Sequence, residues 1–241
     1  MRRPAGLALL LLVALGTTAC SDAETATESA TESAQASAPT EEITMTAADH
    51  ELFAAASAGD ADAARTALDA GADIEVRGNA GQTPLIAATK QNRVDAARVL
   101  IEAGADVNAK DDIQDSAYLY AGARGHDEIL VLTLDNGADL TSTNRFGGTA
   151  LIPASERGLL PTIRILLDAG VDVNHINNLD WTALHEAIVL GDGSGTYVEV
   201  VRTLIEGGAD VTIPDGAGVS PRELAATRGY DAIVAEIDRA G

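Results

Sequence analysis

Residues 182–191 read TALHEAIVLG, and related segments recur along most of the 241-residue chain. The segments start at His50, Thr83, Ser116, Thr149, Thr182 and Ser220. The first five start 33 residues apart, and the sixth starts 38 residues after the fifth, because an insertion near residues 191–196 follows Gly191. A second motif, Gly-Ala-Asp or Gly-Val-Asp, keeps the same register and begins at Gly71, Gly104, Gly137, Gly170 and Gly208. Two motifs in one register indicate tandem units that bury their apolar faces against their neighbours.

Each unit has the start and stop signals of two short helices. The Ser or Thr that opens each segment from residue 83 onward can accept backbone N–H bonds at a helix start. The glycine of the second motif suits the left-handed residue that ends a helix. Stretches such as residues 94–101 (VDAARVLI) have apolar residues three and four apart, which is typical of an amphipathic helix. We expect an N-terminal cap at Asp49 and His50, and an exposed C-terminal cap that includes Glu236, Asp238 and Arg239.

The 33-residue period and the Thr182-Ala183-Leu184-His185 segment resemble the ankyrin-repeat family, and the resemblance covers residues 46–241. It implies an all-α solenoid of helix-turn-helix units with β-hairpin or turn connections. The third repeat departs most from the family pattern, because Gln114 stands where a turn glycine is expected. His126 and His185 match structural histidines of the family, so no catalytic residue, cofactor or metal ligand is expected, and the protein is not expected to be an enzyme.

The first 20 residues resemble the signal peptide of a bacterial lipoprotein. Arg2 and Arg3 precede an apolar run that is too short to span a membrane comfortably, and small residues lead to Cys20, the only cysteine. The resemblance implies lipidation at Cys20, although Thr17 replaces the usual leucine, and it implies anchoring on the extracytoplasmic face of the cell membrane. If Cys20 is incidental, the protein is secreted or periplasmic. Residues 21–45, rich in Ala, Ser, Thr and Glu, predict a disordered tether.

The charge balance restricts the class of partner. The chain has 37 acidic and 16 basic residues, for a net charge of −21. This charge repels nucleic acid and anionic lipid headgroups, so we expect neither to be a direct partner. It favours a basic protein or a basic segment. Because the chain is expected to be exported, we expect its partner to be an envelope protein, and we expect the protein itself to be a monomer.

The partner surface follows from the resemblance, since ankyrin domains bind through the hairpin tips and the outward side of the first helices. Apolar and arginine side chains gather at these positions in the fourth and fifth repeats, and such side chains often contribute most to binding. Trp181, which directly precedes the Thr182-Ala183-Leu184 turn, can alternatively brace the neighbouring hairpin. Val189 and Leu190 can alternatively pack under the inserted loop. The candidate partner-binding residues are Ile113, Arg145, Phe146, Arg157, Asn178, Leu179, Trp181, Val189 and Leu190.

Two features leave other functions open. Asp111, Asp112 and Asp115 form an acidic cluster, and the insertion at 191–196 superficially resembles a calcium loop. Neither has the ligand count of an EF-hand, so we expect solvated surface acids in both places. The alternative is a small-ligand-binding or metal-binding protein, or an enzyme, that uses one of these features. A cell-surface spacer without a specific partner is a third possibility.

Overall fold

The structure, a computed structural model, describes residues 45–241. The predicted signal peptide with Cys20, and the predicted tether apart from Met45, lie outside the described residues. The described part contains twelve α-helices and no strand, so the all-α prediction is confirmed, and the connections are turns and not β-hairpins. The helices are α1 (Ala47–Ala58), α2 (Ala61–Asp69), α3 (Pro84–Lys90), α4 (Val94–Glu102), α5 (Ala117–Arg124), α6 (Asp127–Asp135), α7 (Leu151–Glu156), α8 (Leu160–Asp168), α9 (Ala183–Val189), α10 (Gly195–Glu206), α11 (Pro221–Thr227) and α12 (Asp231–Ala240).

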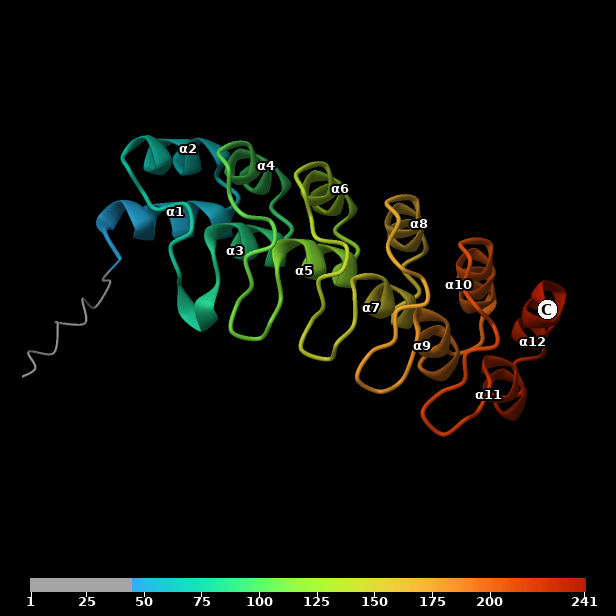
Figure 1. Ribbon diagram of the computed structural model, residues 1–241. Helices are drawn as coiled ribbons and strands as arrows, with labels where there is room; N and C mark the ends of the chain where they lie inside the picture. Colours follow the sequence, from blue (N-terminus) through green and yellow to red (C-terminus); the bar gives the residue numbers. More distant parts are fainter. Residues whose placement is uncertain (1–44) are drawn as a thin grey trace, which may run out of the picture. The chain divides into compact units, whose positions relative to one another are not determined.

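The helices form two rows. The odd-numbered helices make one row and the even-numbered helices the other, and the loops between successive repeats project beyond the odd-numbered row (Figure 1). Each helix packs against its partner in the repeat and against the equivalent helices of the neighbouring repeats, as α5 does with α3, α6 and α7. Among the described residues, no helix is long and apolar enough to cross a membrane.

The helix starts follow the predicted capping pattern with one exception. The hydroxyls of Thr83 and Ser116 each accept a backbone N–H bond at 3.2 Å from the third residue of the helix. At Thr182 the backbone N–H donates to Nδ1 of His185 at 3.1 Å. The prediction is wrong at Thr149, whose buried hydroxyl has no partner among the described residues. There the Thr149 carbonyl accepts from the Ile152 N–H at 3.2 Å, so a tightened first turn replaces the side-chain cap.

The helix ends are confirmed at the predicted glycines. Gly104, for example, has φ 97° after α4, and the other four glycines of the motif are also left-handed. The third repeat shows how the array tolerates a departure. Gln114 takes φ 66° at the place where Gly147 has φ 72°, although left-handed backbone is unfavourable for a residue with a side chain.

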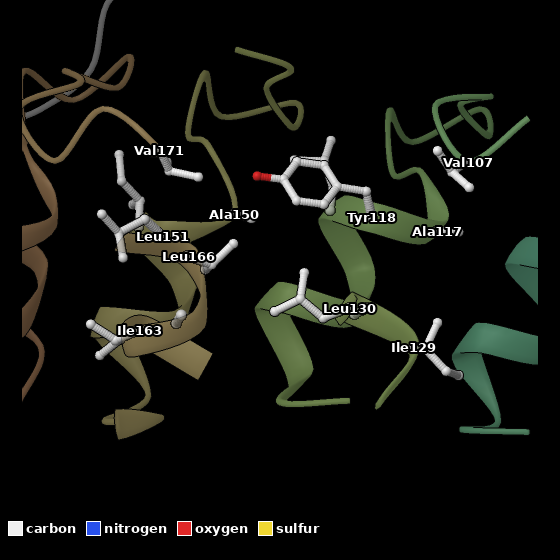
Figure 2. Close-up of a cluster of buried hydrophobic side chains, with 14 of the residues drawn as sticks. Val107, Ala117, Tyr118, Ile129, Leu130, Ala150, Leu151, Ile163, Leu166 and Val171 are labelled. Atoms are coloured by element: carbon white, nitrogen blue, oxygen red, sulfur yellow. The ribbon is translucent and has the colours of Figure 1, made fainter. Parts of the chain in front are cut away.

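The core is continuous between repeats and is built mainly from Ala, Leu, Ile and Val. Figure 2 shows Leu130, Leu151, Ile163 and Leu166 in one such cluster, and burying a side chain of this size contributes about 1.5–3 kcal/mol. Close packing needs small residues, since a Cβ on Gly122 of α5 would lie 2.8 Å from the Cβ of Ala150, next to α7. Figure 2 also shows Tyr118, which is fully buried and whose hydroxyl has no partner among the described residues.

The insertion is largely absorbed by α10. The sixth repeat starts 38 residues after the fifth and not 33, so five residues are added. Three of them lengthen the helix, because α10 has 12 residues where α4 and α8 have 9. Asp192 caps the turn before it by accepting the Ser194 N–H at 2.9 Å. The Tyr230 hydroxyl donates to the Gly191 carbonyl at 3.1 Å and holds the turn in place.

The C-terminal cap differs from the prediction at Glu236. This side chain is buried, whereas Asp238 and Arg239 are exposed. Its carboxylate accepts from Arg202 of α10 at 2.6 Å and from Arg239 at 2.6 and 2.7 Å. Glu236 therefore joins the last two repeats and does not belong to the exposed surface.

Candidate functional site

Five-residue loops present the tips of the repeats, and an Asp or Asn side chain holds each of four loops in shape. The Asn144 Oδ1 accepts the N–H groups of Phe146 at 2.8 Å and Gly148 at 3.1 Å. The Asn177 Oδ1 does the same for Leu179 at 2.8 Å and Trp181 at 3.1 Å. Asp111 and Asp215 have this role in the third and sixth repeats. An Asp or Asn in one register of the repeat was the sequence signal for these loops.

The third residue of each loop faces solvent, and in three neighbouring repeats it is a large apolar residue. Ile113, Phe146 and Leu179 are 42%, 55% and 57% exposed. The Arg145 guanidinium lies 4.5 Å from the centre of the Phe146 ring, which is a cation–π contact. Exposed apolar side chains in a row are typical of a partner-binding surface.

Backbone bonds join some of these loops to each other. The Asp112 N–H donates to the Ala80 carbonyl at 3.0 Å, and the Asn178 N–H donates to the Phe146 carbonyl at 3.0 Å. The loops are numbered by their repeat. Within residues 45–241 no equivalent backbone bond joins the third loop (residues 111–115) to the fourth (residues 144–148). Next to these two loops the Lys110 ammonium donates to the Thr143 carbonyl at 2.7 Å.

A pocket of about 310 Å³ lies where these loops meet α5, α7 and α9. It contains five of the candidate partner-binding residues and omits four. Those on the pocket are Arg145, Phe146, Arg157, Leu179 and Leu190. Those elsewhere are Ile113 and Asn178 on exposed loops, Trp181 at the half-buried end of the fifth loop, and Val189, half-buried in α9. Asp115, predicted as part of the acidic cluster, also lines the pocket, and so do five residues that the sequence pattern did not single out: Tyr120, Ile152, Pro153, Asn177 and Glu186.

One end of the pocket is rich in arginine. The Arg124 guanidinium lies 5.5 Å from the centre of the Tyr120 ring, and Arg145 covers Phe146. Neither arginine forms an ion pair in the described part of the chain. Burial raises the pKa of Asp115 and the charge of Asp111 adds to the effect, while nearby cations, including both arginines, oppose it.

The other end of the pocket contains a buried carboxyl group. Glu186 is only 6% exposed, and its Oε1 accepts from Nδ2 of Asn177 at 2.9 Å. Burial raises the pKa of Glu186 to about 7, and the nearby charge of Glu156 adds to this rise. The sequence did contain a signal for this site, because Glu186 is an acidic residue at a position of the repeat where the other units have none. The equivalent residues are Ala87, Tyr120, Pro153 and Leu224.

The acidic cluster is less exposed than predicted. Asp111 is 3% exposed, and its Oδ2 accepts from the Lys90 ammonium at 2.7 Å, so the prediction of a solvated acid is wrong at this residue. Asp112 is exposed and Asp115 is half-buried. Residues 45–241 bring no three His, Cys, Asp or Glu side chains together in a way that could hold a metal ion.

Comparison with known proteins agrees with this architecture. A family model described as ankyrin repeats (3 copies) matches residues 41–111 and 118–215. A crystal structure of an ankyrin repeat domain from Acinetobacter baumannii AYE is similar, with 52% sequence identity and a TM-score of 0.77, over 79% of this chain and 97% of that one. A second crystal structure, of another ankyrin repeat protein, has 37% identity and a TM-score of 0.76 over 79% and 98% of the two chains. No curated protein matches the sequence. The chain belongs to the ankyrin-repeat family.

Proposed function

We propose that this chain is a protein-interaction module that binds an envelope protein through its loop tips and the pocket between the third and fifth repeats. Ankyrin repeats are a general protein-interaction scaffold, and the fold is typically a non-enzymatic binding scaffold. The observation that carries the proposal is the row of exposed apolar tips, Ile113, Phe146 and Leu179, beside a pocket that contains arginines. These residue types often contribute most to interface energy.

The proposal includes the location and character of the complex. The chain is displayed on the extracytoplasmic side of a bacterial membrane, with a lipid anchor at Cys20, and it acts as a monomer. Its partner is basic, because a net charge of −21 attracts a basic surface over distances up to about the Debye length, roughly 8 Å at physiological salt. Association with such a partner weakens as salt rises.

Site-specific crosslinking in cells tests the surface. A photoreactive phenylalanine derivative replaces Leu179 on a loop tip in one variant, and Val131 on α6 in the other. Both side chains are exposed and apolar, but only Leu179 lies on the proposed surface. We expect a discrete adduct with a basic envelope protein, identified by mass spectrometry, from position 179 and not from position 131.

The Phe146→Ala substitution sharpens this test. In the variant with the crosslinker at position 179 it should lower the adduct yield about tenfold or more, since removal of an interface aromatic commonly costs more than about 1.4 kcal/mol. The melting temperature should change little because Phe146 is mostly exposed. Equal adducts from positions 179 and 131, or none from position 179, would contradict the proposal.

A further inference from the structure

We propose that the Glu186 end of the pocket binds a cationic side chain, lysine or arginine, of the protein partner. The inference rests on the proposed function only in that the cation belongs to a protein. It adds the residue that recognises the cation and the chemistry of the contact.

The first observation is an unpaired oxygen in a buried carboxyl group. Asn177 donates to Oε1 of Glu186, and no described residue donates to Oε2. Three side-chain atoms of the described residues are fully enclosed and have no hydrogen-bond partner, namely Tyr118 Oη, Thr149 Oγ1 and His185 Nε2. Glu186 Oε2 is not one of these enclosed atoms. Oε2 is therefore not fully enclosed, and the pocket that Glu186 lines offers a donor from outside the chain a route to it. Buried carboxylates are costly unless they are paired, so this oxygen favours a donor from outside the chain.

The second observation is the charge around this oxygen. Two charged residues at the C-terminal end of α7 affect the pKa of Glu186: the charge of Glu156 raises it and the charge of Arg157 lowers it. The Arg157 Nη1 is directed to the Pro153 carbonyl at 3.2 Å and to Glu156 Oε2 at 3.5 Å, and it forms no hydrogen bond with Glu186. With two carboxyl groups, Glu156 and Glu186, and one guanidinium, Arg157, this end of the pocket has more acidic than basic groups. Because burial raises the pKa of Glu186 to about 7, its carboxyl group is partly protonated near neutral pH. A bound cation would relieve the repulsion between the two carboxylates.

The third observation is the shape of the approach to Glu186. Leu179 and Leu190 are exposed apolar side chains on the same pocket. Lysine and arginine have apolar stems that pack on such side chains while the charged end reaches further. The pocket volume of about 310 Å³ is at the small end of the range for small-molecule sites, which suits a single side chain.

Binding of n-butylammonium, a mimic of the lysine side chain, tests the inference by NMR on the purified chain at about pH 8, above the pKa of Glu186. The Asn177 side-chain amide and the methyl groups of Leu179 and Leu190 report on the site. We expect saturable shifts with a dissociation constant on the order of 10 mM. Glu186→Gln, which preserves the acceptor for Asn177, should weaken binding about tenfold or more. The matched control Glu128→Gln, an exposed acid of α6, should leave binding unchanged.

Three results would overturn the inference: equal shifts with 1-butanol at matched ionic strength, unchanged binding in Glu186→Gln, or saturable binding of butyrate and not of butylammonium. The outcomes separate this inference from the proposed function. Crosslinking from position 179 without butylammonium binding would remove the cation site and keep the interaction module. Butylammonium binding without an adduct from position 179 would keep the cation site and remove the interaction module.

Discussion

Glu186 links the protonation of one residue to the stability of the fold, because burial raises its pKa from 4.5 to about 7. Between these two values the folded state retains a proton that the unfolded state has released. Stability therefore falls as pH rises through this range, and the loss is complete above about pH 7. A shift of this size corresponds to up to about 3 kcal/mol.

Glu186→Gln should therefore stabilise the protein at high pH. We expect the variant to have a larger free energy of unfolding than the parent at about pH 8, by about 2–3 kcal/mol, and a similar one at about pH 4. Urea denaturation over this pH range measures the difference. A variant that is no more stable than the parent at pH 8 would show that the carboxylate is not costly in the folded state. Glu128→Gln should show no such dependence on pH, because Glu128 is exposed.

At the scale of the element, a single side-chain oxygen organises each loop. Asn144→Ala removes the acceptor of two backbone N–H bonds and should lower the free energy of unfolding by about 1–3 kcal/mol, measured by thermal and urea denaturation. Asn144→Asp should retain most of the stability, because Asp111 and Asp215 have the same role in other loops. Asn79→Ala, on an exposed loop tip of the second repeat, is the matched control. Equal losses in the two alanine variants would contradict this role of Asn144.

Local sequence signals were sufficient to predict most of the helices, but they were insufficient to predict the residues that form the pocket. Capping residues and terminal glycines act within a few residues of each other, so the helix bounds follow from the pattern, apart from the tightened turn at Thr149. Burial of Asp111 depends on Lys90 of the preceding repeat, and burial of Glu236 depends on Arg202, 34 residues away. Glu186 acquires its raised pKa from burial in the array and from Glu156. A carboxylate that looks exposed along the chain can thus be enclosed once the repeats stack.

At the scale of the whole molecule, the proposed anchor separates binding from location. Cys20→Ser removes the thiol that would be acylated, and one acyl chain alone gives only marginal membrane binding whereas two or more give stable anchoring. We expect the variant to move from the membrane fraction to the soluble extracytoplasmic fraction in cell fractionation, while crosslinking from position 179 to a soluble partner persists. A variant that still sediments with membranes would rule out the lipid anchor as the cause of attachment.

The loop-to-loop bonds also affect how the array deforms. Backbone bonds join the second loop to the third and the fourth to the fifth, whereas the flexible Lys110 side chain spans the third and fourth. This seam runs through the pocket, whose walls come from both loops. Separating two loops should cost less free energy where no backbone hydrogen bond joins them than at the two neighbouring seams, where such a bond would have to break. We expect an inserted side chain to widen the pocket at this seam more than at the seams on either side.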